Sequence, residues 1–343
     1  MNAPHLTGQG AGAYLTDTGG GLVGMPVGVD PTTSAGWLCN WHSAFGGGAD
    51  PCAVAGNARL FMLREGRSGA RVWRSATNGQ SQRSDPGGDP ANAAALMQLL
   101  IGAGAWDMLH LQGLSPEWAA ALTRAARDAG LVAGPEHSFA HAQAVIDDPA
   151  AYLAGRSAST FKRKAKQQRQ LHRARPVSFD EHAGADLPAA LRSYCAAERG
   201  SWKSQDGELI SDNPRLEQFY GGLFHPDTTF ARPRIFFMRA GGRIIAGLLA
   251  LEQGPRLVLL KMFYDAEMAK YSPGFLLLEH IVQGHLRAGQ VIDFYADGPS
   301  YAPFTNRQQR FDDIVIWAAG PRAAAFRLLR SAMQKVRHLR QRT

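Results

Sequence analysis

A short turn in the second half of the chain has the residue types of an anion-binding helix start. Tyr271 is followed by Ser272-Pro273-Gly274, in which the serine can cap a helix and the proline suits its first position. The backbone N–H groups of a first helical turn, with the helix dipole behind them, bind anions. Positions 272–278 contain no acidic residue, and Lys270 lies directly before them. These features predict an anion site at residues 270–274, and an ordinary Ser-Pro helix start is the alternative.

Acidic residues near this turn are candidates for a proton acceptor. Asp293 lies in the expected strand 291–295 and shares a face with Val291 and Tyr295, an apolar setting that would raise its pKa. The alternative is an aspartate at the end of a strand that bonds to the backbone. Asp297 and Asp265 are further candidates. Possible proton carriers, each with a structural role as the alternative, are Tyr264, Tyr295 and Tyr301.

Three residues are candidates for binding a second substrate. Trp202 and Lys203 are adjacent in sequence and could line an acceptor site, and Lys261 in the expected strand 257–264 is the third candidate. The alternative for the first two is a tryptophan in the core and a lysine at the surface.

The turn lies inside an expected strand–helix–strand unit. The apolar, aromatic-rich run 257–264 predicts a buried strand, residues 265–271 a polar loop, and 291–295 a second strand. The helix between them is indicated by apolar residues at helical spacing, with Gly289 at its end: Leu277, Leu278, Ile281, Val282 and Leu286. Such a crossover joins parallel strands.

Both halves of the chain alternate predicted strands and helices, which indicates the α/β class with a mixed (α+β) sheet. In the first half we expect a helix at 37–45, a hairpin of 60–63 with 71–73, helices at 92–101 and 116–129, and a strand at 107–111. In the second half we expect further strands at 177–179, 234–239, 243–252 and 312–317, and helices at 187–199 and 214–224. The predicted ranges are a disordered glycine-rich lead at 1–36, an N-terminal domain at 37–148, a basic linker helix at 149–175, a C-terminal domain at 176–320 and a basic amphipathic helix at 321–343.

Four groups of residues agree in order and spacing with one protein family. They are Ser201-Trp202-Lys203 with Gly207 just after, Phe219-Tyr220, Tyr264-Asp265 leading into 271–274, and Asp293-Phe294 followed by Gly298. With these motifs, residues 175–320 resemble the CelD-like branch of the GNAT acyltransferase superfamily, which is associated with polysaccharide biosynthesis. Residues 37–150 agree more loosely, through Trp37, Trp41 and the run 106–114. The superfamily signature Arg/Gln-x-x-Gly-x-Gly/Ala is absent, and the Tyr-Lys pair of the branch reads Tyr301-Ala302 here, with Pro303 next.

The resemblance implies two tandem GNAT-like domains in a Fem-type arrangement. It also implies transfer of an acyl group from acetyl-CoA or another acyl-CoA to a nitrogen or oxygen of a small-molecule or saccharide acceptor. The donor would lie in a slot between the strands 257–264 and 291–295, with its pyrophosphate at Lys270, Tyr271, Ser272, Pro273 and Gly274. The catalytic candidates would be Asp293, Asp297 and Tyr264. Two alternatives stay open: a Fem-type transferase with an aminoacyl-tRNA donor, and a binding protein without activity, which the altered motif at 301–303 suggests.

Composition limits the remaining classes. No segment approaches the roughly 18 consecutive apolar residues of a membrane span. The N-terminal residues lack the basic start and apolar core of a secretory signal, which favours a cytoplasmic protein. The three cysteines, Cys39, Cys52 and Cys195, are scattered and fit reduced thiols. Because metal-ligand spacing, the serine-hydrolase Gly-x-Ser-x-Gly motif and the P-loop motif do not occur, we expect no metal site and neither of these two activities.

The net charge of +8 is concentrated in two segments. Residues 149–179 carry eight Lys and Arg and no acid, and residues 314–343 carry seven and no acid. The first segment is predicted to be a solvated linker helix, with a clamp for the phosphate of coenzyme A or for RNA as its rival. Few aromatic residues interleave with its charges, so nucleic acid is the less favoured ligand. In the second segment, Phe326, Leu329, Met333 and Val336 predict a helix that docks on its own domain, with contact to an anionic membrane surface as the alternative.

Overall fold

The computed structural model describes residues 30–46, 52–67, 69–205 and 209–340. Most of the predicted glycine-rich lead lies outside these ranges. Its last residues differ from the prediction of disorder, because Pro31–Thr33 form a 3-10 helix (η1) in which Thr32 is fully buried. The Asp30 carboxylate caps this helix by accepting a hydrogen bond from the backbone N–H of Thr32 at 2.9 Å. A cap followed by a proline is sufficient to order this short segment.

The described residues pack into two compact units. Unit 1 contains Gly46–Phe139 and the segment that begins at Arg310, and unit 2 contains the segment that ends at Phe45 and Ala140–Gln309. These units cut across the predicted domain ranges. The helix around Trp37 packs in unit 2, and the predicted linker 149–175 lies wholly inside that unit.

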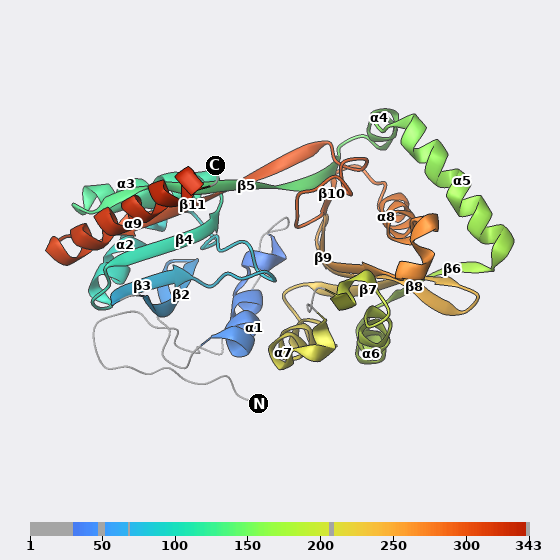
Figure 1. Ribbon diagram of the computed structural model, residues 1–343, viewed down its shortest axis with the longest axis horizontal. Helices are drawn as coiled ribbons and strands as arrows, with labels where there is room; N and C mark the ends of the chain where they lie inside the picture. The colour runs from blue at the N-terminus through green and yellow to red at the C-terminus, as the bar shows by residue number, and fades with distance from the viewer. Residues whose placement is uncertain (1–29, 47–51, 68, 206–208, 341–343) are drawn as a thin grey trace. The chain divides into compact units, whose positions relative to one another are not determined.

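Unit 1 is a mixed sheet with helices on both faces (Figure 1). Its strands follow the order β1-β2-β3-β4-β11, and β3–β4 is a parallel pair among antiparallel ones. Leu109 and Leu111 of β4 face the cluster that holds α2 and α3, whereas Met108 faces the cluster that holds Phe326 of α9. The bounds are Cys52–Ala55 (β1), Ala58–Arg67 (β2), Ala70–Ser75 (β3), Met108–Leu114 (β4), Arg307–Trp317 (β11), Pro90–Asn92 (η2), Ala93–Gly102 (α2), Pro116–Asp128 (α3) and Pro321–Arg340 (α9).

The C-terminal helix α9 docks on unit 1, whose other residues come mainly from the predicted N-terminal domain rather than from the predicted C-terminal domain that precedes the helix. Arg322 donates to Asp107 Oδ2 at 3.1 Å, Phe326 packs against the apolar cluster around Met108, and Arg330 pairs with Glu136. These three residues recur every four positions and therefore lie on one face of the helix. The side chain of Val336, the last residue of the predicted stripe, lies outside the described part.

Asp107 should make the stability of the protein sensitive to acid. Burial raises the pKa of its carboxyl, but hydrogen bonds from Arg71 and the charges of Arg71 and Arg322 outweigh burial and lower the pKa. A lowered carboxyl pKa stabilises the fold above about pH 4, and this contribution is lost as the pH falls through the folded-state value. In acid unfolding followed by circular dichroism, Asp107→Asn should therefore lose less stability than wild type below about pH 4. Equal losses would contradict the assigned role of this carboxylate.

Unit 2 is built around the strands β5-β10-β9-β8-β7-β6, which are hydrogen-bonded in this order. The antiparallel meander β7-β8-β9 enters a crossover through α8 to β10, which pairs parallel with β9, as predicted. Figure 1 shows α6 and α7 on one side of these strands and α8 on the other. The bounds are Ala35–Phe45 (α1), Val132–Ile146 (β5), Pro149–Ala154 (α4), Ala158–Ala174 (α5), Val177–His182 (β6), Gly184–Asp186 (η3), Leu187–Glu198 (α6), Trp202–Gln205 (η4), Ile210–Asp212 (η5), Pro214–Leu223 (α7), Arg232–Ala240 (β7), Arg243–Gln253 (β8), Arg256–Tyr264 (β9), Ala266–Tyr271 (η6), Pro273–Gly284 (α8) and Gln290–Asp293 (β10).

Two boundaries of the crossover differ from the prediction. Helix α8 ends at Gly284 rather than near Gly289, and Gly289 instead forms a turn with φ of 81° directly before β10. Strand β10 ends at Asp293 rather than at Tyr295, because Tyr295 has φ of 52° and leaves the extended conformation. Both differences depend on backbone conformations that apolar periodicity does not encode.

Candidate functional site

The edge of β9 that faces β10 is paired with that strand only over its first three residues. The last residue pair between them is Asp293 with Val258, so residues 259–264 continue β9 without a β10 partner. On the other edge, the register shifts between the pairs Ala250–Leu259 and Leu249–Lys261, which leaves Leu260 as a bulge. A bulge bends a strand and increases its twist. The predicted slot therefore begins where β10 ends.

Helix α8 begins beside this free edge with the anion-binding features predicted from the sequence. Its first turn contains no acidic residue, and Pro273 occupies one of the first two positions. The backbone N–H of Leu276 is bonded to the Ser272 carbonyl. The N–H groups of the preceding helical residues have no intrahelical partner and carry the positive end of the dipole. The start of α8 therefore has the electrostatic character that an anion requires.

Ser272 does not cap the helix, contrary to the prediction. It has left-handed backbone angles (φ 54°, ψ 51°), and its side chain accepts no cap hydrogen bond. Its hydroxyl instead accepts a hydrogen bond from Lys164 Nζ at 2.7 Å and donates one to Gln167 Oε1 at 3.1 Å. Gln167 Nε2 in turn donates to the Lys270 carbonyl at 2.9 Å. The turn 270–272 is thus held by two side chains of α5.

Helix α5 packs against this site, which departs from the predicted solvated linker helix and is compatible with its rival, an anion clamp. Phe161 contacts Phe275 of α8 with ring centroids 5.3 Å apart, and Leu171 is fully buried. Lys164 is half-buried, and burial together with the neighbouring Arg163 lowers the pKa of its ammonium group. Other basic residues of the helix are exposed: Lys162, Arg163, Lys166 and Arg169. Lys164 is therefore the α5 cation placed against the α8 start.

Tyr264 and Gly274 contact each other across the space between β9 and α8. A β-carbon added at Gly274 would lie 3.4 Å from both Tyr264 Cδ1 and Met262 Cε, an ordinary contact distance. The Tyr264 ring lies 6.2 Å from the ring of Trp202. Trp202 is 40% exposed, which excludes the core role left open for it, and Lys203 Nζ lies 5.5 Å from its ring. The structure thus brings Trp202, Lys203, Tyr264 and residues 270–274 together.

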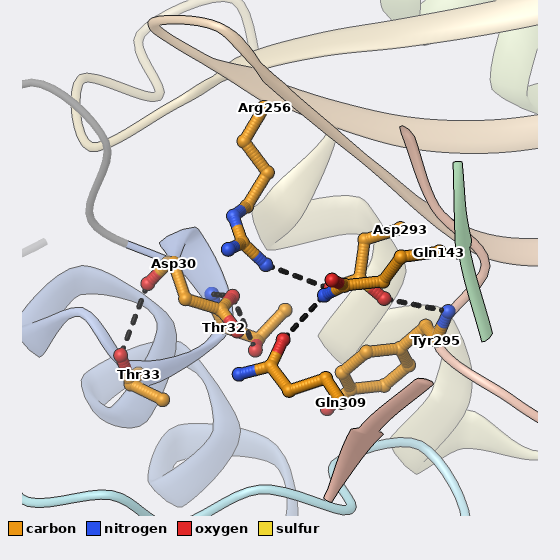
Figure 2. Close-up of polar contacts among 8 residues, drawn as sticks. All are labelled: Asp30, Thr32, Thr33, Gln143, Arg256, Asp293, Tyr295 and Gln309. Carbon is orange, nitrogen blue, oxygen red and sulfur yellow. Dashed lines mark hydrogen bonds and ion pairs between the residues drawn. The ribbon is translucent and has the colours of Figure 1, made fainter. Parts of the chain in front are cut away.

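Asp293 is buried among polar partners, not in the apolar setting expected for a proton acceptor. Its carboxylate accepts hydrogen bonds from Arg256 Nη1 at 2.8 Å, from Gln143 Nε2 at 3.1 Å and from the Tyr295 backbone N–H at 3.0 Å (Figure 2). Gln143 Nε2 also contacts Gln309 Oε1. Three donors stabilise the ionised carboxylate and occupy its oxygens. The geometry favours the alternative reading, a strand-end aspartate that organises the backbone.

Tyr295 has a strained backbone next to this aspartate. A left-handed φ is unusual for a residue with a bulky side chain and persists only where surrounding contacts enforce it. The Tyr295 ring is buried 5.2 Å from the ring of His141 and 6.3 Å from that of Trp37. The sequence predicts no role for His141 or Gln143, because β5, which carries both, is not predicted from its residues.

The other candidate acids and tyrosines occupy simpler positions. Asp265 is buried, caps η6 through the Glu267 N–H at 3.0 Å and pairs with Arg243, so its role is structural. Asp297 is exposed on the loop after β10 and accepts from the Gly298 N–H at 2.8 Å. Tyr301 stacks on Phe294 with ring centroids 5.0 Å apart, and burial raises the pKa of its hydroxyl.

Lys261 lies on the opposite face of β9 from Tyr264. Its ammonium group is buried 3.3 Å from Glu198 Oε1 of α6, and Glu198 Oε2 accepts from the Ile210 N–H at 3.0 Å. Phe263, two residues along, packs on Tyr194 of the same helix. The structure therefore separates Lys261 from the turn 270–274.

In the part of the chain that the structure describes, no cluster of three His, Cys, Asp or Glu residues could hold a metal ion. Among the described helices, none is long and apolar enough to cross a membrane.

Comparison with known proteins adds a family to this geometry. Residues 158–302 match the family model described as an acetyltransferase (GNAT) domain. This segment is similar to GNAT acetyltransferases. The match runs from the start of α5 to the loop after β10 and includes the turn 270–274, although it covers less than half of the chain. No curated protein matches the chain.

Solved structures share the fold at low sequence identity. They include FemX (TM-score 0.55, 13% identity, covering 84% of this chain and 92% of that chain). Another is a conserved protein of unknown function from Bacteroides thetaiotaomicron VPI-5482 (TM-score 0.54, 12% identity, 82% and 90%). A third is the C-terminal domain of a putative lysylphosphatidylglycerol synthetase from Agrobacterium fabrum (TM-score 0.52, 14% identity, 84% and 90%).

These likenesses confirm the predicted fold class, a mixed α/β fold consistent with two GNAT-like domains. At such identities they show the fold alone. The finer resemblance to the CelD-like branch is not confirmed by them.

Proposed function

We propose that this protein is an acyl-CoA-dependent acyltransferase of the GNAT type, in which residues 270–274 bind the pyrophosphate of the donor. The observation that carries the proposal is the contact of Lys164 with Ser272 at the acid-free start of α8. There a cation and the positive end of a helix dipole meet, which is the combination that an anionic phosphate requires. The GNAT family match over the same segment supports acetyl-CoA or a longer acyl-CoA as the donor.

The free edge of β9 would bind the amide-containing arm of the donor. Residues 259–264 have backbone groups on the side where β10 has ended. An extended chain of amides can bond to such an edge as an added strand would. A donor bound along this edge would extend from the start of α8 toward the end of β10, where its thioester would react.

The transfer itself needs an acceptor, a proton carrier and a leaving thiolate. The acceptor nitrogen or oxygen attacks the thioester carbonyl, the carbon–sulfur bond breaks, and the thiolate takes up the proton that the acceptor loses. Tyr264, beside Gly274, and the exposed Asp297 are the proposed proton carriers. Asp293 would act by positioning Arg256 and Tyr295 rather than by accepting a proton.

The acceptor would lie beside Trp202 and Lys203, near the donor turn. An exposed aromatic ring with an adjacent ammonium group suits a small molecule or saccharide. The resemblance to the CelD-like branch suggests a role in polysaccharide or cell-envelope biosynthesis, and use of acyl-CoA implies a cytoplasmic location.

A Fem-type transferase that uses aminoacyl-tRNA is the second candidate. It is favoured by the exposed basic residues of α5 and by the fold likeness to FemX. A clustered basic face attracts nucleic acid through its phosphates. The third candidate is a binding protein without activity. The motif at residues 301–303 is altered, and its tyrosine, Tyr301, stacks on Phe294 in the structure, which suits a structural role.

A thermal-shift assay with a panel of acyl-CoA compounds distinguishes these three candidate functions. Acetyl-CoA or longer acyl-CoAs should raise the melting temperature, since a ligand at 100 times its Kd stabilises the native state by about 2.7 kcal/mol. Binding of tRNA with a steep salt dependence, and no shift with any acyl-CoA, would replace the proposal by the Fem-type function. A shift with acyl-CoA but no acyl transfer to any amine or saccharide tested would favour the inactive binding protein.

A further inference from the structure

Unit 1 contains a cleft that is separate from the proposed donor site. It has a volume of about 650 Å³ and lies between strands β2, β3, β4 and β11 and helix α9. Small-molecule sites occupy roughly 300–1,000 Å³ and combine apolar walls with a few converging polar groups. The lining of this cleft combines apolar side chains with polar and ionic ones, and the sheet and α9 contribute to both kinds.

The apolar part includes side chains of α9 that the docking of this helix leaves uncovered. Leu329 and Met333 line the cleft and are each 53% exposed, although they belong to the helix face that carries Phe326. They face Val72 and Trp317 of the sheet across the cleft. Covering such side chains with a hydrocarbon chain would remove their apolar surface from water, which is favourable. Leu328, by contrast, is 70% exposed and does not line the cleft.

The polar part of the lining contains ionic groups that pair with each other. Glu136 accepts from Arg330 and lies 2.9 Å from His110 Nε2, and Glu65 pairs with Arg74. Burial raises the pKa of Glu136, but the hydrogen bonds and charges of His110 and Arg330 outweigh it and lower the pKa. The two carboxylates and the two guanidinium groups of these pairs sum to zero formal charge. A charged headgroup would therefore bring an unpaired charge into a half-buried site, which is costly.

We propose that this cleft binds a neutral amphiphile, with its alkyl or acyl chain against Leu329 and Met333 and its uncharged polar head at Glu136 and Gln112. Hydroxyl or amide groups of the head can donate to and accept from these side chains without disturbing the ion pairs. The site is independent of the donor turn in unit 2.

Calorimetric titration of the full chain with octyl glucoside, kept below its micellar concentration, tests the proposal. Wild type should bind one molecule saturably. Leu329→Glu should weaken binding at least tenfold, because it places a charge where the chain lies. The matched variant Leu328→Glu, one residue away on the same helix, should stay within twofold of wild type. Both variants should keep the wild-type melting temperature and the same affinity for acetyl-CoA.

The headgroup is tested with octanoate and octylamine as charged probes of the same chain length. Wild type should bind both at least fivefold more weakly than octyl glucoside. Glu136→Gln removes one negative charge, which leaves Arg330 without its counter-charge, and should shift the preference at least fivefold toward octanoate. The proposal is overturned if wild type shows no saturable site, if both leucine variants lose affinity equally, or if the charged probes bind as well as the neutral one. Equal losses would mean unspecific adsorption to the exposed helix.

Discussion

Replacing Lys164 by Glu should weaken the binding of acetyl-CoA by at least about tenfold, while the fold is retained. Lys164 Nζ lies 2.7 Å from Ser272 Oγ, at the start of α8, and is half-buried. Loss of one charge-assisted hydrogen bond costs about 1.5–3 kcal/mol, which corresponds to roughly 10- to 150-fold in affinity. The glutamate would add repulsion of the phosphates, so this range is a lower bound for the reversed charge.

Lys166→Glu is the matched control for this variant. It makes the same charge change on the same helix, but Lys166 is exposed. Its effect should arise only through screened, long-range electrostatics, so we expect less than about threefold and disappearance of the effect at high salt. Calorimetry at low and high salt measures both variants, with circular dichroism and melting temperatures as folding controls. If the two variants lose affinity equally, or if neither does, the pyrophosphate does not bind at 270–274.

The parts of this site that sequence could predict are local ones. The strand 257–264 and the helix start at Ser272-Pro273 follow from short-range periodicity and turn chemistry, and both are present, whereas residues 266–271 of the predicted loop form the 3-10 helix η6. The capping role of Ser272 failed for a long-range reason. Its hydroxyl contacts Lys164 and Gln167, which are 108 and 105 residues away in sequence. No local pattern contains that contact.

Strand β5 is a whole element that local sequence patterns do not predict. Its 15 residues include Gly134, Pro135 and several polar side chains, a composition more typical of a loop. Pairing with β10, a long-range contact, gives the last four of these residues, 143–146, their strand partners. Because β5 was not predicted, the amide of Gln143 was missing from the expected surroundings of Asp293, and the setting was interpreted as apolar.

The fold class itself depended less on such contacts. The alternation of strands and helices, with glycine turns at 241–242 and at Gly254, specified the meander of unit 2. The division of the chain into two packing units could not be predicted from this alternation. α1 packs in unit 2 with α7, where Asn40 Nδ2 donates to the Phe219 carbonyl at 2.9 Å, across 179 residues of sequence.

Asp293→Asn should destabilise the protein by about 3–5 kcal/mol, the usual cost of removing one partner from a buried ion pair. The carboxylate is fully buried and accepts from Arg256, Gln143 and the Tyr295 N–H. An asparagine amide has one acceptor oxygen and would face these donors with an NH₂ group. It would also leave the guanidinium of Arg256, whose side chain is 17% exposed, without its counter-charge. Urea unfolding of the variant and wild type measures this loss.

Asp297→Asn is the matched control, because Asp297 is exposed and its carboxylate accepts one neighbouring N–H. Its stability should stay within about 0.5 kcal/mol of wild type, as for most surface substitutions. If Asp293 were instead the general base, its asparagine variant would keep the wild-type stability and lose about 10²- to 10⁴-fold in kcat. That outcome would restore Asp293 as a catalytic residue. Should Asp293→Asn not fold, Arg256→Gln removes the same ion pair from the other side. Loss of stability with retained kcat in this variant would support the positioning role, whereas unchanged stability would contradict it.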